Sequence, residues 1–218
     1  MNELKKEMQS RWNEHADSYD SSEAHGLSNP WAIKRWSGLL EGKQGQTLLD
    51  VGCGTGFVSL LAAKAGLKVT GVDWSEGMMG RAKEKAKEEN LEITFVCSDT
   101  EALPFASDTF QNLTARHVIW TLTDPVSTFR EWCRVLQPGG QVIVDYSPRK
   151  GELKTYHYRQ EVESQLPLNR DVASSVIADM FCEAGFSNVQ VQENSHIHPK
   201  TETEEESIHT IYQFIATK

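Results

Sequence analysis

One short stretch constrains this chain more than any other: an apolar run, three alternating glycines and the start of a helical pattern, Leu48-Leu49-Asp50-Val51-Gly52-Cys53-Gly54-Thr55-Gly56-Phe57. The pattern predicts a buried strand, a tight turn and the N-terminus of a helix. Glycine lets the turn adopt positive φ and lets a ligand approach the backbone. A helix N-terminus presents unpaired N–H groups to a negatively charged group. The stretch therefore predicts a site for a nucleotide-type cofactor.

The spacing of the glycines narrows the choice of cofactor. A dinucleotide fingerprint requires G-x-G-x-x-G. Gly52 and Gly54 fit it, but the third position is Phe57 and the extra glycine, Gly56, comes one place early. The acid Asp50 before the turn would repel a pyrophosphate and would favour a cofactor with an ammonium or sulfonium group. We therefore favour S-adenosylmethionine; an NAD-dependent oxidoreductase requires that the misplaced glycine be ignored.

The composition bounds the classes of protein that this chain can belong to. With 218 residues, it is long enough for one well-buried α/β domain, which we expect to span 1–218. A net charge of −9 argues against a nucleic-acid-binding surface. The charged start Met1-Asn2-Glu3-Leu4-Lys5-Lys6 does not read as a signal peptide, and no run is long enough for a membrane span. We expect a cytoplasmic protein that binds neither nucleic acid nor membrane.

Cysteines and histidines give no metal signature. Four scattered cysteines lack C-x-x-C spacing and predict buried free thiols; they are Cys53, Cys97, Cys133 and Cys182. His196 and His198 would share one face of a strand, with His209 further on. No carboxylate or cysteine is well placed to complete a site, so we predict no metal.

Four ordered motifs across roughly 47–147 extend the signal of the glycine turn. Because of them, the sequence resembles the class I S-adenosylmethionine-dependent methyltransferases. It is most similar to the small-molecule subgroup that includes the ubiquinone/menaquinone-biosynthesis C-methyltransferases. The matching segments are Asp50–Gly56, Val69–Asp73, Ser98-Asp99 with Leu103-Pro104-Phe105, and Arg134–Gly140.

This resemblance implies an α/β, Rossmann-like, doubly wound sheet of seven strands. The implied order is 3-2-1-4-5-7-6, with the last strand antiparallel. It also implies an N-terminal helical lid (1–42), a cofactor-binding core (47–147), a substrate lid insertion (151–168), and a closing helix and hairpin (169–218). The residue patterns predict helices over 3–20, after Asn29-Pro30, and over 76–90, 125–136 and 169–185, and strands over 68–73, 92–97, 110–116, 141–146, 189–193 and 210–217.

Asp73 is the first cofactor residue predicted outside the glycine turn. It lies 21 residues after Gly52, the spacing of an acid that accepts hydrogen bonds from ribose hydroxyls. Ser75 is a predicted helix N-cap. The resemblance adds further candidates around the cofactor, each of which could instead be structural. The full predicted cofactor set is Asp50, Gly52, Cys53, Gly54, Thr55, Gly56, Asp73, Trp74, Met78, Asp99, Thr100, Arg116 and, from the lid, Trp12 and Tyr19.

The helix predicted after Asn29-Pro30 carries two basic residues, and one predicted strand is polar. Lys34 and Arg35 could reach the cofactor carboxylate, although solvated surface charge is the simpler role. The predicted strand 110–116 is less apolar than usual in the family, because it contains Gln111, Asn112 and Thr114. Arg116 and His117 follow at its carboxyl end, where open α/β sheets bind ligands.

Methyl transfer from a sulfonium is an in-line displacement that mainly requires positioning in a dry cleft. The sequence therefore fixes no catalytic residue; His117 is the first candidate for a general base. Tyr146, Tyr156 and His157 are candidates for contact with a small-molecule acceptor. Two alternatives stay open: methylation of a protein or RNA, and a catalytically silent module that binds adenosylmethionine.

Overall fold

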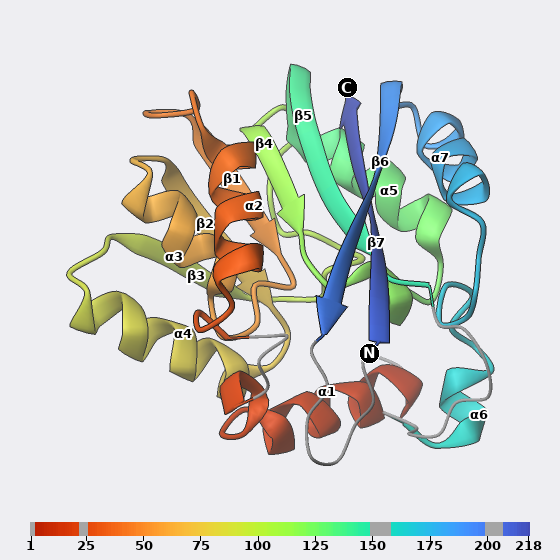
Figure 1. The fold of residues 1–218 in the computed structure, drawn as a ribbon, viewed down its shortest axis with the longest axis horizontal. Coiled ribbons are helices and arrows are strands. Elements are labelled where there is room, and N and C mark those ends of the chain that lie inside the picture. Colours follow the sequence, from red (N-terminus) through yellow and green to blue (C-terminus); the bar gives the residue numbers. More distant parts are fainter. Residues whose placement is uncertain (1–2, 22–25, 149–157, 199–206) are drawn as a thin grey trace.

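The computed structural model describes residues 3–21, 26–148, 158–198 and 207–218. Within them, seven strands form one sheet in the order β3-β2-β1-β4-β5-β7-β6 (Figure 1). Only β7 runs antiparallel to its neighbours, β5 and β6. This confirms the predicted order and the antiparallel last strand. The strands are β1 (Thr47–Val51), β2 (Lys68–Asp73), β3 (Ile93–Cys97), β4 (Phe110–Ala115), β5 (Leu136–Tyr146), β6 (Ser187–His198) and β7 (Ser207–Thr217).

Helices cover both faces of this sheet. They are α1 (Glu3–His15), α2 (Pro30–Leu40), α3 (Phe57–Lys64), α4 (Glu76–Glu88), α5 (Pro125–Val135), α6 (Gln160–Glu163) and α7 (Ser174–Glu183), with 3-10 turns η1 (Tyr19–Ser21) and η2 (Ile119–Thr121). Three helices begin at a side-chain cap that accepts a backbone N–H: Asn29 for α2, Ser75 for α4 and Asp124 for α5. The predicted cap at Ser75 is thereby confirmed.

Some boundaries differ from the sequence prediction. The first helix ends at His15, and η1 replaces the rest of the predicted 3–20 helix. The last helix begins at Ser174 rather than at 169. Strand β5 begins at Leu136, because that residue pairs with Phe110 before the chain bulges, and regular pairing resumes at Gln141. The start of β5 thus depends on tertiary pairing, which a local pattern cannot show.

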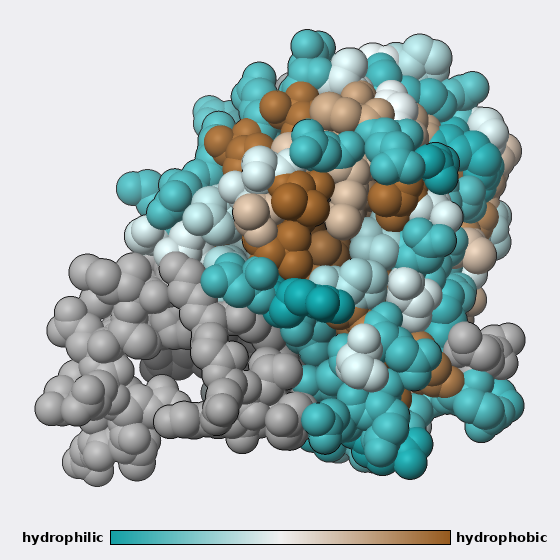
Figure 2. Space-filling model, turned by 90° about the vertical axis from the view of Figure 1, so that its right-hand side faces the viewer, coloured by the Kyte–Doolittle hydropathy of each residue, from teal (hydrophilic) through white to brown (hydrophobic). Residues whose placement is uncertain are grey.

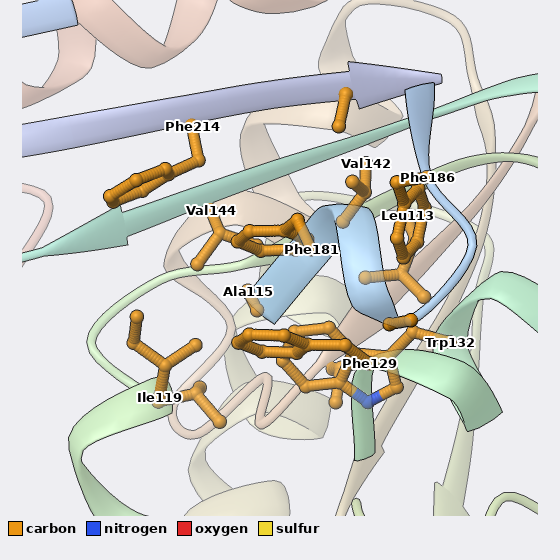
Figure 3. Close-up of a cluster of buried hydrophobic side chains, with 14 of the residues drawn as sticks. Leu113, Ala115, Ile119, Phe129, Trp132, Val142, Val144, Phe181, Phe186 and Phe214 are labelled. Carbon is orange, nitrogen blue, oxygen red and sulfur yellow. The ribbon is translucent and has the colours of Figure 1, made fainter. Parts of the chain in front are cut away.

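The largest core cluster lies between the sheet and the pair α5 and α7 (Figure 3). Phe129 of α5 and Phe181 of α7 stack with ring centroids 4.1 Å apart, and Phe181 also packs on Phe214 of β7. Val144 of β5 faces this cluster, while its neighbour Ile143 packs on the opposite side with α2 and α3. The two-residue alternation of a strand thus divides the core into two layers.

Helix α1 lies across the carboxyl edge of the parallel strands, at the bottom of Figure 1. Its residue Met8 is buried in a small cluster with Trp74, which follows β2, and with residues around α6. That cluster contains Tyr158, Val162 and Leu166. The N-terminal helix therefore joins the cofactor side of the sheet to the segment before α7.

One face of the molecule is mixed in polarity, and the four cysteines are free thiols. The face that carries α7 mixes hydrophobic residues with many hydrophilic ones (Figure 2). In the described part of the chain, no helix is both long and apolar enough to cross a membrane. The cysteines are free, as predicted, but the prediction that they are buried holds for Cys53 alone: Cys97 and Cys182 are exposed. Cys97 is exposed because β3 is an edge strand with one neighbour.

Candidate functional site

A pocket opens where the carboxyl ends of β1, β2 and β4 meet the N-terminal segment. Apart from Val118 and Thr121, its lining consists of residues that the sequence predicts. The lining residues are Trp12, Tyr19, Gly52, Gly54, Asp73, Trp74, Met78, Thr100, Arg116, His117, Val118 and Thr121. Residues from separate segments of the chain therefore meet at one place. Val118 and Thr121 carry no chemical motif and could be found only from the fold.

The glycine turn brings bare backbone to the floor of this pocket. Gly52 has φ of 62°, and a Cβ at this position would lie 2.4 Å from Val118 Cγ2. A side chain there would both strain the backbone and clash. The turn continues through Gly54 to Gly56, which caps the N-terminus of α3. Cofactor atoms could therefore approach the backbone here.

Asp73, the last residue of β2, presents an acceptor to the pocket. Its Oδ2 accepts the Gly54 N–H at 2.9 Å, and its Oδ1 accepts the Ser75 N–H at 2.8 Å. Burial raises the pKa of this carboxyl, and the backbone hydrogen bonds oppose that rise. Because each carboxylate oxygen has two lone pairs, Asp73 can also accept from a ligand hydroxyl. This is the chemistry that ribose binding requires.

Asp50 lies in β1, two residues before Gly52. It lines a smaller cavity beside the pocket, together with Cys53 and Thr55. Its carboxylate accepts hydrogen bonds from Ser59 Oγ at 2.6 Å and Thr114 Oγ1 at 2.9 Å. Burial raises its pKa to about 6, although both hydroxyls stabilise the charged form. Asp50 therefore lies near the glycine turn, and its hydrogen bonds also connect β1 to α3 and β4.

One face of α1 binds the core through polar side chains spaced four residues apart. Lys5 Nζ lies 2.8 Å from Asp99 Oδ2 and 3.0 Å from Glu101 Oε2. Gln9 Nε2 donates to the Trp74 carbonyl at 2.6 Å. Asn13 Oδ1 accepts from Ser75 Oγ at 2.7 Å and from the Gly77 N–H at 3.1 Å. A spacing of four places these side chains on one helical face, a signal that the sequence analysis missed.

The segment after α1 closes the pocket. Asp20 accepts from Thr55 Oγ1 at 2.7 Å and pairs with Lys85 Nζ at 2.5 Å, so it fastens η1 to the glycine turn. Trp12 packs edge-on against Tyr19 with centroids 6.0 Å apart. The cavity volume of the pocket is about 60 Å³, well below the roughly 300 Å³ at the lower end of small-molecule sites. The pocket is therefore smaller than a cofactor of adenosylmethionine size needs, and Trp12 and Tyr19 are among the side chains that line it.

Asp99 and Thr100 follow β3 on the side where the adenine is predicted. Thr100 lines the pocket, and its carbonyl accepts from Trp132 Nε1 at 3.0 Å. Asp99 is not among the lining residues; its carboxylate accepts from Lys5 and from the Glu101 N–H. Contact of Asp99 with adenine stays a prediction, and it would compete with the lid helix for the same carboxylate.

A buried cluster of charged side chains lies beside the part of the pocket that Arg116 and His117 line. Arg35 Nη2 lies 2.6 Å from Asp145 Oδ2, and the side chains are 10% and 0% exposed. Asp145 Oδ1 accepts the N–H of His117, a residue with φ of 58°. Arg116 stacks over Phe57, with Cζ 3.9 Å from the ring centroid.

These contacts place Arg35 differently from the solvated surface position that its sequence favoured. Its partner Asp145 lies 110 residues away on β5, a distance over which no local pattern extends. Burial raises the pKa of Asp145, but His117, Arg35 and Arg116 outweigh it, so the pKa lies below its ordinary value. Burial lowers the pKa of Arg116, whereas Asp145 and Tyr19 raise it. The structure therefore holds Asp145 as a carboxylate that positions the loop of His117.

The predicted acceptor residues fall in different places. Tyr146 is buried, and its hydroxyl donates to the Arg170 carbonyl and accepts the Val172 N–H, so it holds the segment before α7. Tyr146 lies outside the pocket lining, and its contact with an acceptor stays a prediction. Tyr156 and His157 lie outside the described residues. An aromatic wall beside Trp12 was missed: Trp120 lies 6.0 Å from it and Tyr158 6.4 Å, measured between ring centroids.

The titratable side chains around the sheet do not add a metal centre. In residues 3–21, 26–148, 158–198 and 207–218, no three His, Cys, Asp or Glu side chains are arranged to hold a metal ion. His196 pairs in register with His209 across β6 and β7.

Comparison with known proteins places this geometry in context. The family described as "Methyltransferase domain" matches residues 49–144. Demethylmenaquinone methyltransferase of Listeria welshimeri is 31% identical over 181 residues, which cover 70% of this chain and 75% of the relative. Ubiquinone biosynthesis O-methyltransferase of Coxiella burnetii is 34% identical over 115 residues, which cover 53% of this chain and 48% of the relative. Against it, as against relatives from Renibacterium salmoninarum and Geobacter sulfurreducens, the chain spans about half the relative's length.

Solved structures share the fold over nearly the whole chain. Phosphoethanolamine N-methyltransferase 2 of Haemonchus contortus, in complex with S-adenosyl-L-methionine, aligns with a TM-score of 0.68 at 20% identity; the alignment covers 95% of this chain and 60% of that one. An S-adenosylmethionine-dependent methyltransferase from Thermotoga maritima aligns with a TM-score of 0.67 at 20% identity, covering 97% and 99%. At these identities, the likeness concerns the fold.

Proposed function

Because this chain belongs to the class I S-adenosylmethionine-dependent methyltransferases, we propose that it transfers a methyl group from that cofactor to a small-molecule acceptor. The observation that carries the proposal is the pocket itself. Bare backbone at Gly52 and Gly54, the acceptor Asp73 and the cation Arg116 line one cavity. Among them, Asp73 offers an acceptor to the ribose hydroxyls and Arg116 a cation to the carboxylate of the cofactor.

The residues present fit adenosylmethionine chemically. Asp73 would accept from the ribose hydroxyls, and Met78, Trp74 and Thr100 would surround the adenine. Arg116, whose guanidinium lies over Phe57, would attract the amino-acid carboxylate. Since Trp12 and Tyr19 line this small cavity, binding would begin with displacement of the lid. Closure afterwards would exclude water from the reacting groups.

The bound cofactor would supply the electrophilic methyl carbon, which an acceptor takes by in-line displacement as the carbon–sulfur bond breaks. The protein's task is then to orient the acceptor and, where needed, to remove its proton. His117 is the proposed base because it lines the pocket and because Asp145 fixes its backbone through a 2.9 Å hydrogen bond. A histidine can accept a proton near neutral pH.

An aromatic acceptor suits this site better than a charged polymer. Trp12 lines the pocket, and Trp120 and Tyr158 pack around it. Flat aromatic side chains favour flat apolar ligands. The similar proteins named for ubiquinone biosynthesis and demethylmenaquinone support a ring-containing acceptor for this chain too. The net charge of −9 disfavours RNA.

Calorimetric titration with S-adenosylmethionine, S-adenosylhomocysteine and NAD tests the cofactor assignment. We expect micromolar binding of the first two and none of NAD. Methyl transfer from labelled adenosylmethionine to catechol, 1,4-naphthohydroquinone and ethanolamine then tests the acceptor class, with the two aromatic compounds expected to react.

Three outcomes would count against the proposal. A folded protein that binds neither adenosyl compound would overturn the cofactor assignment. Binding without transfer to any small acceptor would favour a silent adenosylmethionine-binding module. Transfer to ethanolamine alone would overturn the aromatic acceptor while leaving the reaction class intact.

A further inference from the structure

A second cavity lies at the opposite edge of the sheet, where β1, β4 and β5 begin. Its volume is about 320 Å³, and its lining residues are Lys43, Gln46, Gln111, Asn112, Gln137, Pro138, Gly139, Gly140 and Gln141. Along β5, Gln141 is five residues from Tyr146, about 17 Å in an extended strand. In Figure 1, β4 and β5 begin at the upper edge of the sheet, whereas α1 crosses the lower edge. It is therefore separate from the proposed methyl-transfer site.

A bulge in the sheet opens this cavity. Phe110 pairs with Leu136, and the next regular pair joins Asn112 to Gln141. Between these two pairs, β4 has one residue, Gln111, whereas β5 has four, residues 137–140. Gly140 permits the tight return, because a Cβ there would lie 2.8 Å from the Gln137 carbonyl oxygen. Residues 137–140 all line the cavity.

The lining is unusually polar for the centre of a parallel sheet. Such strands are normally near-continuous apolar runs, yet Asn112 of β4 is 1% exposed. A buried amide is costly unless its polar atoms are hydrogen-bonded. The hydrogen bonds of Asn112 and of the glutamine side chains around it therefore determine how the cavity lining is arranged.

Two groups that can only donate hydrogen bonds determine the orientation of the side-chain amides. Lys43 Nζ lies 2.8 Å from Asn112 Oδ1 and 2.7 Å from Gln141 Oε1; an ammonium only donates, so both amides must present oxygen to it. Asn112 Nδ2 consequently donates to Gln46 Oε1 at 2.8 Å. The Thr47 N–H, also donor-only, faces Gln111 Oε1 at 3.1 Å. Four amide oxygens are thus occupied by protein donors.

What this network leaves for a ligand is a set of donors. Within the described residues, no protein group accepts a hydrogen bond from the amino groups of Gln46, Gln111 and Gln141, which lie beside the positive charge of Lys43. Among the described residues, the lining contains no Asp or Glu. Burial lowers the pKa of Lys43, as expected for a cation without a carboxylate partner. The nearby Lys218 ammonium is already paired with Asp108 at 2.6 Å.

We propose that this amino-edge cavity binds a small metabolite through an oxyanion, either a phosphate or a carboxylate group. An ammonium and several amide N–H donors, in a described lining that contains no Asp or Glu, match the acceptor oxygens of such a group. The volume suits a small molecule rather than a polymer segment. The proposal does not depend on methyl transfer and can be tested without it.

The test compares the wild-type protein with Gln141→Glu by calorimetric titration. The probes are inorganic phosphate and citrate, each measured against sodium chloride at matched ionic strength. The carboxylate introduced by Gln141→Glu would keep an oxygen for Lys43 while neutralising its charge, so the fold should be retained. Lys68→Met, which removes an exposed lysine at the start of β2, is the matched control.

We expect the wild type and Lys68→Met to bind one of the two anions, and Gln141→Glu to bind it at least tenfold more weakly. Phosphate binding would identify a phosphate ligand, and citrate binding a carboxylate. Adenosylmethionine affinity should be equal in all three proteins. Wild-type protein that responds to neither anion beyond chloride would overturn the proposal, as would undiminished binding by Gln141→Glu or a parallel loss of adenosylmethionine affinity.

Discussion

Lys5 of α1 and Asp99 after β3 are 94 residues apart in sequence, and their side chains meet at 2.8 Å beside the cofactor pocket. The pair fastens the N-terminal helix to the loop predicted to meet adenine. Both side chains are largely buried, at 14% and 26% exposed. Helix α1 is therefore held by a specific contact as well as by the packing of Met8.

Replacing Lys5 by Met should loosen α1 without unfolding the protein. The loss of two ion pairs, to Asp99 and Glu101, should cost about 1 kcal/mol and raise hydrogen exchange of α1 amides several-fold. Lys6→Met is the control, because Lys6 pairs only with the exposed Glu3 at 2.8 Å. Equal protection of α1 in both variants would mean that its apolar face alone holds the lid.

Replacing Asp73 by Ala should weaken adenosylmethionine binding by roughly 1–3 kcal/mol, about five- to 150-fold, because a charged acceptor is lost. Calorimetry measures the effect. The exposed Asp17, which pairs with Arg81 at 2.5 Å, supplies the control Asp17→Asn. Unchanged affinity in folded Asp73→Ala protein would remove Asp73 from the ribose site.

His117→Asn tests the proposed base while preserving the local backbone, since Asn tolerates the left-handed φ of 58° that His117 adopts. Turnover should fall by about 100-fold or more, the usual range for a lost general base. The adenosylmethionine dissociation constant should stay within about threefold. Turnover equal to that of the wild type would dismiss His117 as a base.

Asp50 predicts an unusual pH dependence of stability. Its pKa is about 6 in the folded chain and 3.8 ordinarily, so the folded state holds this proton more tightly between those values. Stability from this group therefore falls as pH rises from about 4 to 6. Relative to Asp50→Asn, the wild type should lose about 2–3 kcal/mol of unfolding free energy across that window.

Urea denaturation at several pH values measures this difference. Asp145, whose pKa is lowered, acts in the opposite direction: its contribution is lost only as pH falls below its ordinary range, so the two windows barely overlap. Asp179→Asn, at an exposed position, should show no such trend. A pH-independent difference between the wild type and Asp50→Asn would show that Asp50 does not hold its proton.

Much of the candidate site could be predicted from the sequence because its parts are local patterns. The turn at Gly52 and the acid at Asp73 end neighbouring parallel strands, and such ends meet at one edge of a sheet. The sheet order itself came from resemblance to a family. The contacts that Lys5 and Asp20 make could not be predicted in this way. Lys5 belongs to a helical spacing of polar residues, but the sequence does not show which residues it meets.

The sequence by itself determined the glycine turn, the acid 21 residues later and the succession of strands and helices, since each depends on residues close along the chain. Only the tertiary structure decided that Arg35 is buried against Asp145, 110 residues away. Only it brought Lys43 to Asn112 and Gln141. The physical reason is that the cost of burying a charge or an amide depends on the partner it meets, and long-range packing chooses that partner.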